Sequence, residues 1–287
     1  AAILAQASED AYVCVLSVLQ PGMGMSSEGT QKVARSMKPQ PGSFLNQLVA
    51  DARAENLPLY AKLRAAPTVS QGVLDELQAR SNVGLLMMGW PGPLEGQALA
   101  DNPVKVAIQQ AQTNIGVFLD RGLSEVKHIL VPTGGGVHAR LALRLAYEIA
   151  EAEGAEVTTL RLVTDPHPTQ EEIEDRRLWL EETIEETLGQ RPDNFTVWVE
   201  LAPSIPEGVI KEVNSGSYDL VIMGASEEWS KNTRLFGSVD DWVASHVDCS
   251  ILLVRRHESQ ALTWWRRQVK QIEDGTDQRD QEISSPA

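Results

Sequence analysis

Cysteine is scarce in this chain, because its 287 residues include only Cys14 and Cys249. Both lie in or beside apolar stretches that are predicted to be buried strands. This placement favours two free thiols in a reducing compartment over a disulfide framework. Long apolar runs are missing too, since no stretch approaches the ~20 residues that a membrane-spanning helix needs.

Basic residues are in the minority, with 25 Lys and Arg against 40 Asp and Glu and a net charge of −15. This charge argues against nucleic acid as a partner, because its phosphates would be repelled. It also argues against docking on an anionic membrane surface, except through a local basic patch. The hydrophobic content of 42% and charged content of 23% are those of a soluble globular protein with room for two ordinary cores.

The chain contains two copies of one pattern. The matching pairs of segments are Ala1–Pro21 with Ala146–Pro166, Leu85–Gly89 with Leu220–Gly224, and Ile115–Leu119 with Ser250–Val254. A repeat of this length is domain-sized, which predicts two tandem domains of one fold. The second copy opens with a strand and a glycine loop, His128–Gly136, that have no counterpart before Ala1. We therefore expect that the first copy lacks its opening strand and that further protein precedes it.

Short apolar runs alternate with stretches of helical spacing in both copies. In the second copy, helices are predicted at Val137–Glu153 and Glu171–Leu188 and a strand at Phe195–Leu201. Strands that alternate with helices predict an α/β fold of two tandem doubly wound parallel-sheet domains. The predicted boundaries are 1–122 for the first domain, 123–257 for the second, and 258–287 for an amphipathic helix and a disordered tail.

Two glycine-bearing loops follow predicted strands of the second copy. In an open parallel sheet, ligands bind beyond the carboxyl ends of the strands, where loop amides and helix starts hold anions. The candidate binding residues are Thr133, Gly134, Gly135, Gly136, Gly224, Ala225, Gly237 and Ser238. Two interpretations stay open for these turns, which are the binding of nucleotide phosphates and a purely structural role.

The second of these loops resembles the nucleotide loop of the universal stress protein family, which is Gly, two residues, Gly, nine residues, Gly, then Ser or Thr. Gly224, Gly237 and Ser238 occupy three of the four places at the right spacing. In that family the glycine amides and the hydroxyl hold the phosphates of ATP, and an acid after the first strand helps to hold the nucleoside. The resemblance implies the same fold and a site for ATP or AMP.

The chain departs from this pattern at two places. The second glycine is replaced by Glu227, which is followed by Glu228, and these carboxylates would repel a phosphate. The acid expected after the first strand is absent, since Thr133 and Gly134 stand there. We therefore expect no bound cofactor. If the loops do bind nucleotide phosphates, the expected ligand is ATP or AMP.

A strand that ends in Gly-Trp-Pro, at Met88–Pro91, carries a second resemblance. Together with a helix and the strand Ile115–Leu119, it is similar to the cytosolic C-terminal domain of cation–chloride cotransporters. These domains have a stress-protein-like fold and belong to the wider amino acid–polyamine–cation permease superfamily. The resemblance implies that a membrane portion of the same transporter precedes the chain.

No catalytic or metal-binding constellation is present. Ser226 lacks the final glycine of a nucleophile elbow, and the five histidines form no helical metal pair. The first hypothesis, which the resemblance to cotransporter domains implies, is a non-catalytic regulatory and assembly domain at the cytoplasmic face of the cell membrane. Its partners would be the membrane portion of the transporter and a second copy. Stress proteins typically pair through their last strand, here Ile115–Leu119 and Ser250–Val254, and the other arrangement is that the two repeats pair this way within one chain. The alternative is a soluble tandem universal stress protein that binds ATP or AMP as a sensor.

Overall fold

The structure is a computed structural model that describes residues 1–6, 11–21, 43–90, 102–225 and 238–258. The amphipathic helix and the tail expected within 258–287 lie outside these residues from position 259 onward. Ala1–Arg256 form one compact unit. None of the helices in the described ranges combines the length and the apolar character that crossing a membrane requires.

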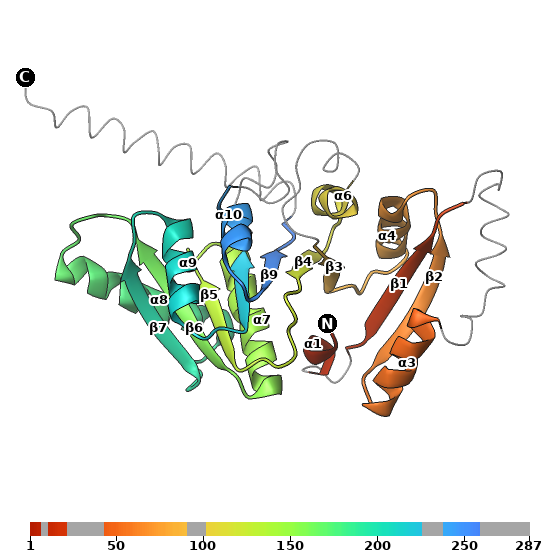
Figure 1. Cartoon of the computed structure of the whole chain (residues 1–287), viewed down its shortest axis with the longest axis horizontal. Coiled ribbons are helices and arrows are strands. Elements are labelled where there is room, and N and C mark those ends of the chain that lie inside the picture. Colours follow the sequence, from red (N-terminus) through yellow and green to blue (C-terminus); the bar gives the residue numbers. More distant parts are fainter. Residues whose placement is uncertain (7–10, 22–42, 91–101, 226–237, 259–287) are drawn as a thin grey trace, which may run out of the picture. The chain divides into compact units, whose positions relative to one another are not determined.

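Strands alternate with helices along the described chain (Figure 1). The strands are β1 (Val13–Leu19), β2 (Leu59–Ala65), β3 (Leu85–Gly89), β4 (Asn114–Leu119), β5 (His128–Pro132), β6 (Glu156–Val163), β7 (Phe195–Leu201), β8 (Leu220–Gly224) and β9 (Ser250–Arg255). The helices are α1 (Ala2–Gln6), α3 (Phe44–Ala54), α4 (Val69–Gln78), α6 (Pro103–Gln110), α7 (Val137–Glu153), α8 (Gln170–Leu188), α9 (Ile205–Ser215) and α10 (Ser238–His246). The predicted α/β class is confirmed.

Local signals set where the helices begin and end. Thr169 precedes α8, and its side chain and that of Glu172 form a reciprocal capping box that satisfies two backbone N–H groups. Ser43 caps α3, because its hydroxyl accepts a hydrogen bond from the Asn46 amide at 3.4 Å. Gly154 ends α7 in the left-handed conformation, with φ at 68°, which favours glycine.

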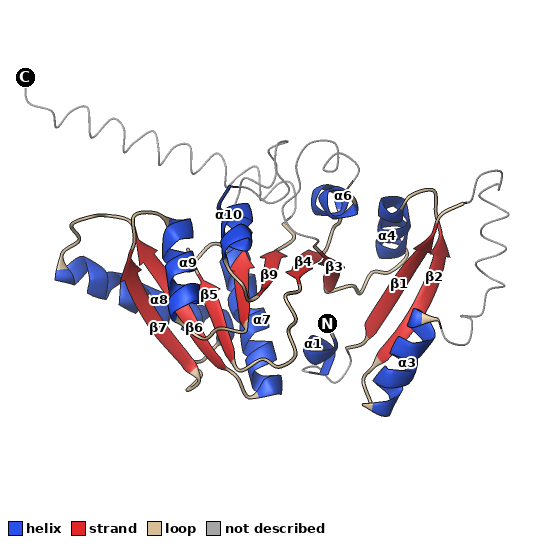
Figure 2. Cartoon of the chain, viewed as in Figure 1, coloured by secondary structure: helices blue, strands red, loops and turns tan. Residues whose placement is uncertain are grey.

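The second half of the chain contributes five parallel strands in the order β7-β6-β5-β8-β9 (Figure 2). The first half adds β4 and β3 to the same sheet, and β4 pairs antiparallel with β9. Val117 lies opposite Leu253 and Phe118 opposite Leu252 in that ladder. The two last strands therefore pair with each other within one chain. Each of them has a strand on both sides, so the expected pairing with a second copy through these strands is wrong.

The first half differs from the expected single parallel sheet. Strands β1 and β2 pair with each other in parallel but form a separate two-stranded sheet. Strands β3 and β4 belong to the seven-stranded sheet instead. The division follows from the absence of a strand, within the described residues, that pairs with both β1 and β3.

Two apolar layers cover the seven-stranded sheet. Helices α7 and α8 pack on one face, where Ile129, Val157 and Leu180 are buried. Helices α9, α10 and α6 pack on the other face, where Leu130, Val209 and Val243 are buried. Neighbouring residues of one strand therefore point to opposite layers, as the pleat requires. This double cover leaves the carboxyl ends of β5, β6 and β8 as the edge where loops gather.

Candidate functional site

The glycine loop after β5 is held in place by Thr133, whose side chain is buried. The Thr133 amide donates a hydrogen bond to the carbonyl of Leu160 on β6 at 2.9 Å. The Thr133 hydroxyl accepts a hydrogen bond from the Gly135 amide at 3.1 Å. These two bonds tie the loop to the ends of adjacent strands and turn the chain into α7.

Gly135 is a glycine for a local reason, since its φ of 78° is a conformation that other residues rarely adopt. Space also excludes a side chain there, because a Cβ at Gly135 would lie 2.3 Å from the ring of Trp179 on α8. Trp179 thus closes one side of the loop. This contact gives Gly135 a packing role that needs no ligand.

Arg161 on β6 lies beneath the same ring, with its guanidinium carbon 4.9 Å from the centre of the Trp179 ring. Its Nη1 donates a long hydrogen bond of 3.4 Å to the Thr133 carbonyl. Its Nε is buried without a hydrogen-bond partner among the described residues. Burial lowers the pKa of Arg161, and the charge of Arg176 lowers it further.

The start of α7 adds partial positive charge to the edge of the sheet where Arg161 lies. Gly136 is its N-cap and supplies no side-chain hydrogen bond to the first turn. A Cβ at Gly136 would meet no atom within 4 Å, so there is open space beside the helix start. Helix N-termini carry partial positive charge, so this edge, with Arg161 beside it, favours an anion.

Gly224 at the end of β8 approaches the backbone of α7. A Cβ there would lie 2.4 Å from the amide nitrogen of Ala139 and 2.6 Å from the carbonyl carbon of His138. Even alanine would therefore displace a helix backbone at this position. The Ala225 amide after it donates to the Val254 carbonyl at 2.8 Å. Both residues thus have packing and ladder roles within the protein itself.

Positions 226 to 237 of the second predicted loop, which include Gly237, lie outside the described residues. Ser238 is described, as the first residue of α10. Asp240 and Asp241 follow in the first turn, and both are buried. Carboxylates in a first turn complement the helix dipole and would compete there with a phosphate. The structure thus brings Thr133–Gly136 and Gly224 to one edge and adds acids near Ser238.

Sequence reasoning missed Arg161, and it assigned Trp179 to packing without placing it beside the loop. Arg161 was hidden because it forms part of no known motif, although a charged residue within an apolar strand is itself a signal. Trp179 is far from the loop in sequence, and no periodicity indicates which residue a helix presents to a loop. The described part of the chain contains no cluster of His, Cys, Asp and Glu suited to a metal ion.

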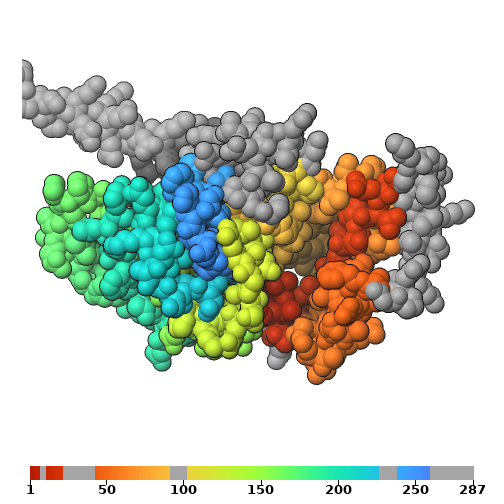
Figure 3. Space-filling model, viewed as in Figure 1, coloured from red at the N-terminus to blue at the C-terminus, as the bar shows by residue number. Residues whose placement is uncertain are grey.

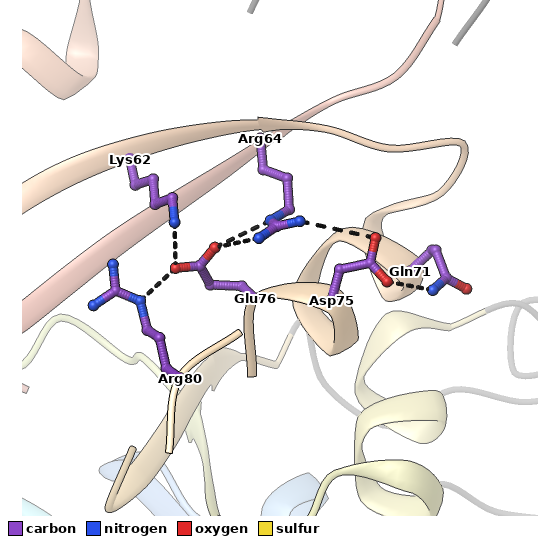
Figure 4. Close-up of polar contacts among 6 residues, drawn as sticks. All are labelled: Lys62, Arg64, Gln71, Asp75, Glu76 and Arg80. Carbon is purple, nitrogen blue, oxygen red and sulfur yellow. Dashed lines mark hydrogen bonds and ion pairs between the residues drawn. The ribbon is translucent and has the colours of Figure 1, made fainter. Parts of the chain in front are cut away.

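A second charged cluster lies in the first half, around Glu76 of α4 (Figure 4). Its carboxylate accepts hydrogen bonds from Lys62 at 2.7 Å, Arg64 at 2.9 Å and Arg80 at 2.5 Å. Burial alone would raise the pKa of Glu76, but the hydrogen bonds from Lys62, Arg80 and Arg64 outweigh it and lower the pKa to about 2. At the rim of the cluster, the Asp75 Oδ2 atom lies 3.9 Å from the Arg64 Nη1 atom.

Three cations surround one carboxylate, so Glu76 is fully committed to two partners on β2 and to Arg80, which follows the end of α4. A catalytic acid or base needs a pKa near the working pH, and Glu76 is far below it. The cluster therefore joins α4 to β2 and performs no acid–base chemistry near neutral pH.

Comparison with known proteins relates this geometry to a family. Residues 125–255 match the universal stress protein family. This match covers less than half of the chain. The matched range contains β5 to β9, the glycine loop and Arg161. A comparison with curated proteins finds no match.

Solved structures extend the likeness over both halves of the chain. The cytoplasmic domain of a prokaryotic cation chloride cotransporter is 14% identical and has a TM-score of 0.52, with 88% of this chain and 99% of that one covered. A protein from Pseudomonas aeruginosa UCBPP-PA14, described as a universal stress protein, is 16% identical with a TM-score of 0.51. It covers 85% of this chain and 93% of that one. At these identities the likeness concerns the fold.

Proposed function

We propose that this chain is a non-catalytic regulatory and assembly domain of a membrane transporter, of the cation–chloride cotransporter or amino-acid permease type. The observation that carries the proposal is the shared fold with a cotransporter cytoplasmic domain over 88% of this chain and 99% of that one. A single universal stress protein domain would account for only residues 125–255. The first half must therefore have its own role, and docking between domains is the role we assign.

The geometry at the end of β8 supports a docking role over phosphate binding. The backbone of α7 occupies the space beside Gly224, and Asp240 and Asp241 stand in the first turn of α10. A phosphate at the α10 start would face these two acids. The chain would then act by docking through its surface and not by binding a nucleotide in a pocket.

The direct test is to determine the reading frame on the upstream side of the codon for Ala1. Membrane spans in the same frame would support the proposal, while a start codon after one further strand would contradict it. The functional test is uptake by the encoded transporter in proteoliposomes, with and without the residues that correspond to 1–256. Equal uptake rates and equal oligomeric states of the two forms would contradict a regulatory and assembly role.

A second candidate, a nucleotide sensor, is favoured by one observation. Arg161 carries a buried Nε without a partner in the described chain, beside the uncapped start of α7. Isothermal titration calorimetry with ATP and AMP tests this candidate, with Arg161→Ala as the variant. Arg177→Ala is the matched control, since that arginine lies on α8 and pairs with Glu174. Micromolar binding that only Arg161→Ala abolishes would favour the sensor, and no heat with any protein would exclude it.

A further inference from the structure

Strands β1 and β3 each have a single strand neighbour among the described residues. Strand β1 pairs only with β2, and β3 pairs only with β4. Each therefore presents one edge whose backbone N–H and C=O groups have no ladder partner in that range. Such an edge is a template for another strand.

In the second half, a central strand lies between the two strands that correspond to β1 and β3. Strand β5 pairs in parallel with β6 on one side and with β8 on the other. Ile129, Leu130 and Val131 of β5 have no exposed surface. By the alignment of the two copies, β6 corresponds to β1 and β8 corresponds to β3.

Burial differs between the two halves in the way that a missing central strand predicts. Residues 220–223 of β8 are all buried, whereas residues 85–88 of β3 are only half-buried. Every residue of β1 is half-buried as well. Figure 3 shows atoms of the β1 segment, coloured red, at the surface of the molecule.

The sequences of β1 and β3 are those of interior strands. Neither VCVLSVL of β1 nor LLMMG of β3 contains a charged residue or a proline. Parallel strands that are covered on both sides have this near-continuous apolar composition. The outermost strands β2 and β7 do carry charges, at Lys62, Arg64 and Glu200, which is how natural edges avoid further pairing. The edges of β1 and β3 have no such protection.

We propose that β1 and β3 together form a receiving site for one extended apolar strand that runs parallel to both, of the same chemistry as β5. With it, the two sheets would become one, in the order β2-β1-strand-β3-β4-β9-β8-β5-β6-β7. In this order, corresponding strands of the two copies lie at equal distances on either side of the β4–β9 ladder. The added strand would pair with both free edges, that of β1 and that of β3. The proposal is independent of the proposed function, because it rests only on pairing, burial and composition.

The internal alignment provides a way to supply such a strand. Ala1 aligns with Ala146, and α1 corresponds to residues inside the last part of α7. A second copy of residues 126–145 fused directly before Ala1 therefore places a strand, the glycine loop and the start of a helix in register with α1. The matched control is the same fusion with Leu130→Pro in the added copy, since proline removes a ladder donor and disrupts a central strand.

Amide hydrogen exchange, measured by mass spectrometry on peptides from β1 and β3, is the readout. We expect exchange of these peptides to slow by about tenfold or more in the fusion and to stay unchanged in the proline control. Peptides from β8 and β9 report whether the rest of the chain is folded. If the fusion does not fold, residues 126–136 added as a synthetic peptide serve as the probe, and saturable protection of β1 and β3 is then the expected result.

Three results would overturn the proposal. The first is unchanged exchange of β1 and β3 in the fusion or with the peptide. The second is protection of these strands in the unmodified chain as strong as that of β5, which would mean that another part of the chain already pairs with them. The third is protection that grows with the concentration of the unmodified chain, which would assign both edges to pairing between copies.

Discussion

Replacing Glu76 by glutamine would remove one buried negative charge and leave the size of the side chain almost unchanged. Lys62, Arg64 and Arg80 would lose the carboxylate that they share. The lowering of the Glu76 pKa from 4.5 to about 2 corresponds to about 3 kcal/mol of stability at neutral pH. The three cations are 23–37% exposed, so solvent screens part of this energy and we expect a loss of about 2 kcal/mol.

Urea unfolding at neutral pH measures this loss, and native-state hydrogen exchange of peptides from β2 and α4 locates it. Asp75→Asn is the matched control on the same helix. The Asp75 side chain is 36% exposed and lies 3.9 Å from Arg64, so its replacement should change stability by less than ~0.5 kcal/mol. A Glu76→Gln variant as stable as the unmodified chain would refute the reasoning.

The pH dependence provides an independent check. Glu76 has a lower pKa in the folded state than its ordinary value of 4.5. Its contribution is therefore fully present above pH 4.5 and is lost as the pH falls towards about 2. The difference in stability between Glu76→Gln and the unmodified chain should shrink across this window. A difference that stays constant down to about pH 2 would show that the charge is not its source.

Three further outcomes are expected. Gly224→Ala should lower stability by about 2–3 kcal/mol in urea unfolding because its Cβ would strike the α7 backbone. Gly136→Ala, with open space around its Cβ, is the control and should cost less than ~1 kcal/mol, which is the loss of a glycine at an N-cap. Val117→Asp should cost more than ~4 kcal/mol because it buries a carboxylate in the β4–β9 ladder. Leu178→Asp, at an exposed position of α8, should have little effect by comparison. Burial raises the pKa of the Cys249 thiol to about 11, so a thiol reagent near pH 8 should modify it slowly until urea unfolds the chain. Fast modification of Cys249 in the folded chain, located by peptide mass spectrometry to separate it from Cys14, would contradict this assignment.

The elements of the second half could be predicted closely from the sequence. Helix α7 spans Val137–Glu153 and strand β7 spans Phe195–Leu201, as the patterns indicated. These elements are set by local signals, such as helical spacing closed by Gly154 and the alternation of Phe195–Leu201. Helix α1 was not predicted. Ala2–Gln6 is too short to be stable alone, and its apolar residues Ile3 and Leu4 pack on the core beside α7.

The domain boundaries and the role of the candidate site residues stay predictions. The glycines could be located from the sequence, but the reasons for them could not. Gly135 faces Trp179 and Gly224 faces the start of α7, and such approaches depend on how distant segments pack. Arg161 and Glu76 were missed for the same reason, since a charge gains its meaning from neighbours that only folding supplies.

The sequence by itself determined the α/β class, the repeat, and the strands and helices other than α1, because periodicity, caps and glycine stops act over a few neighbouring residues. It also indicated the pairing of the two last strands, which β4 and β9 form. Only the tertiary structure decided that β1 and β2 stand apart from the seven-stranded sheet. Sheet membership depends on which strand lies alongside, and a strand's own sequence cannot specify a neighbour that comes from elsewhere.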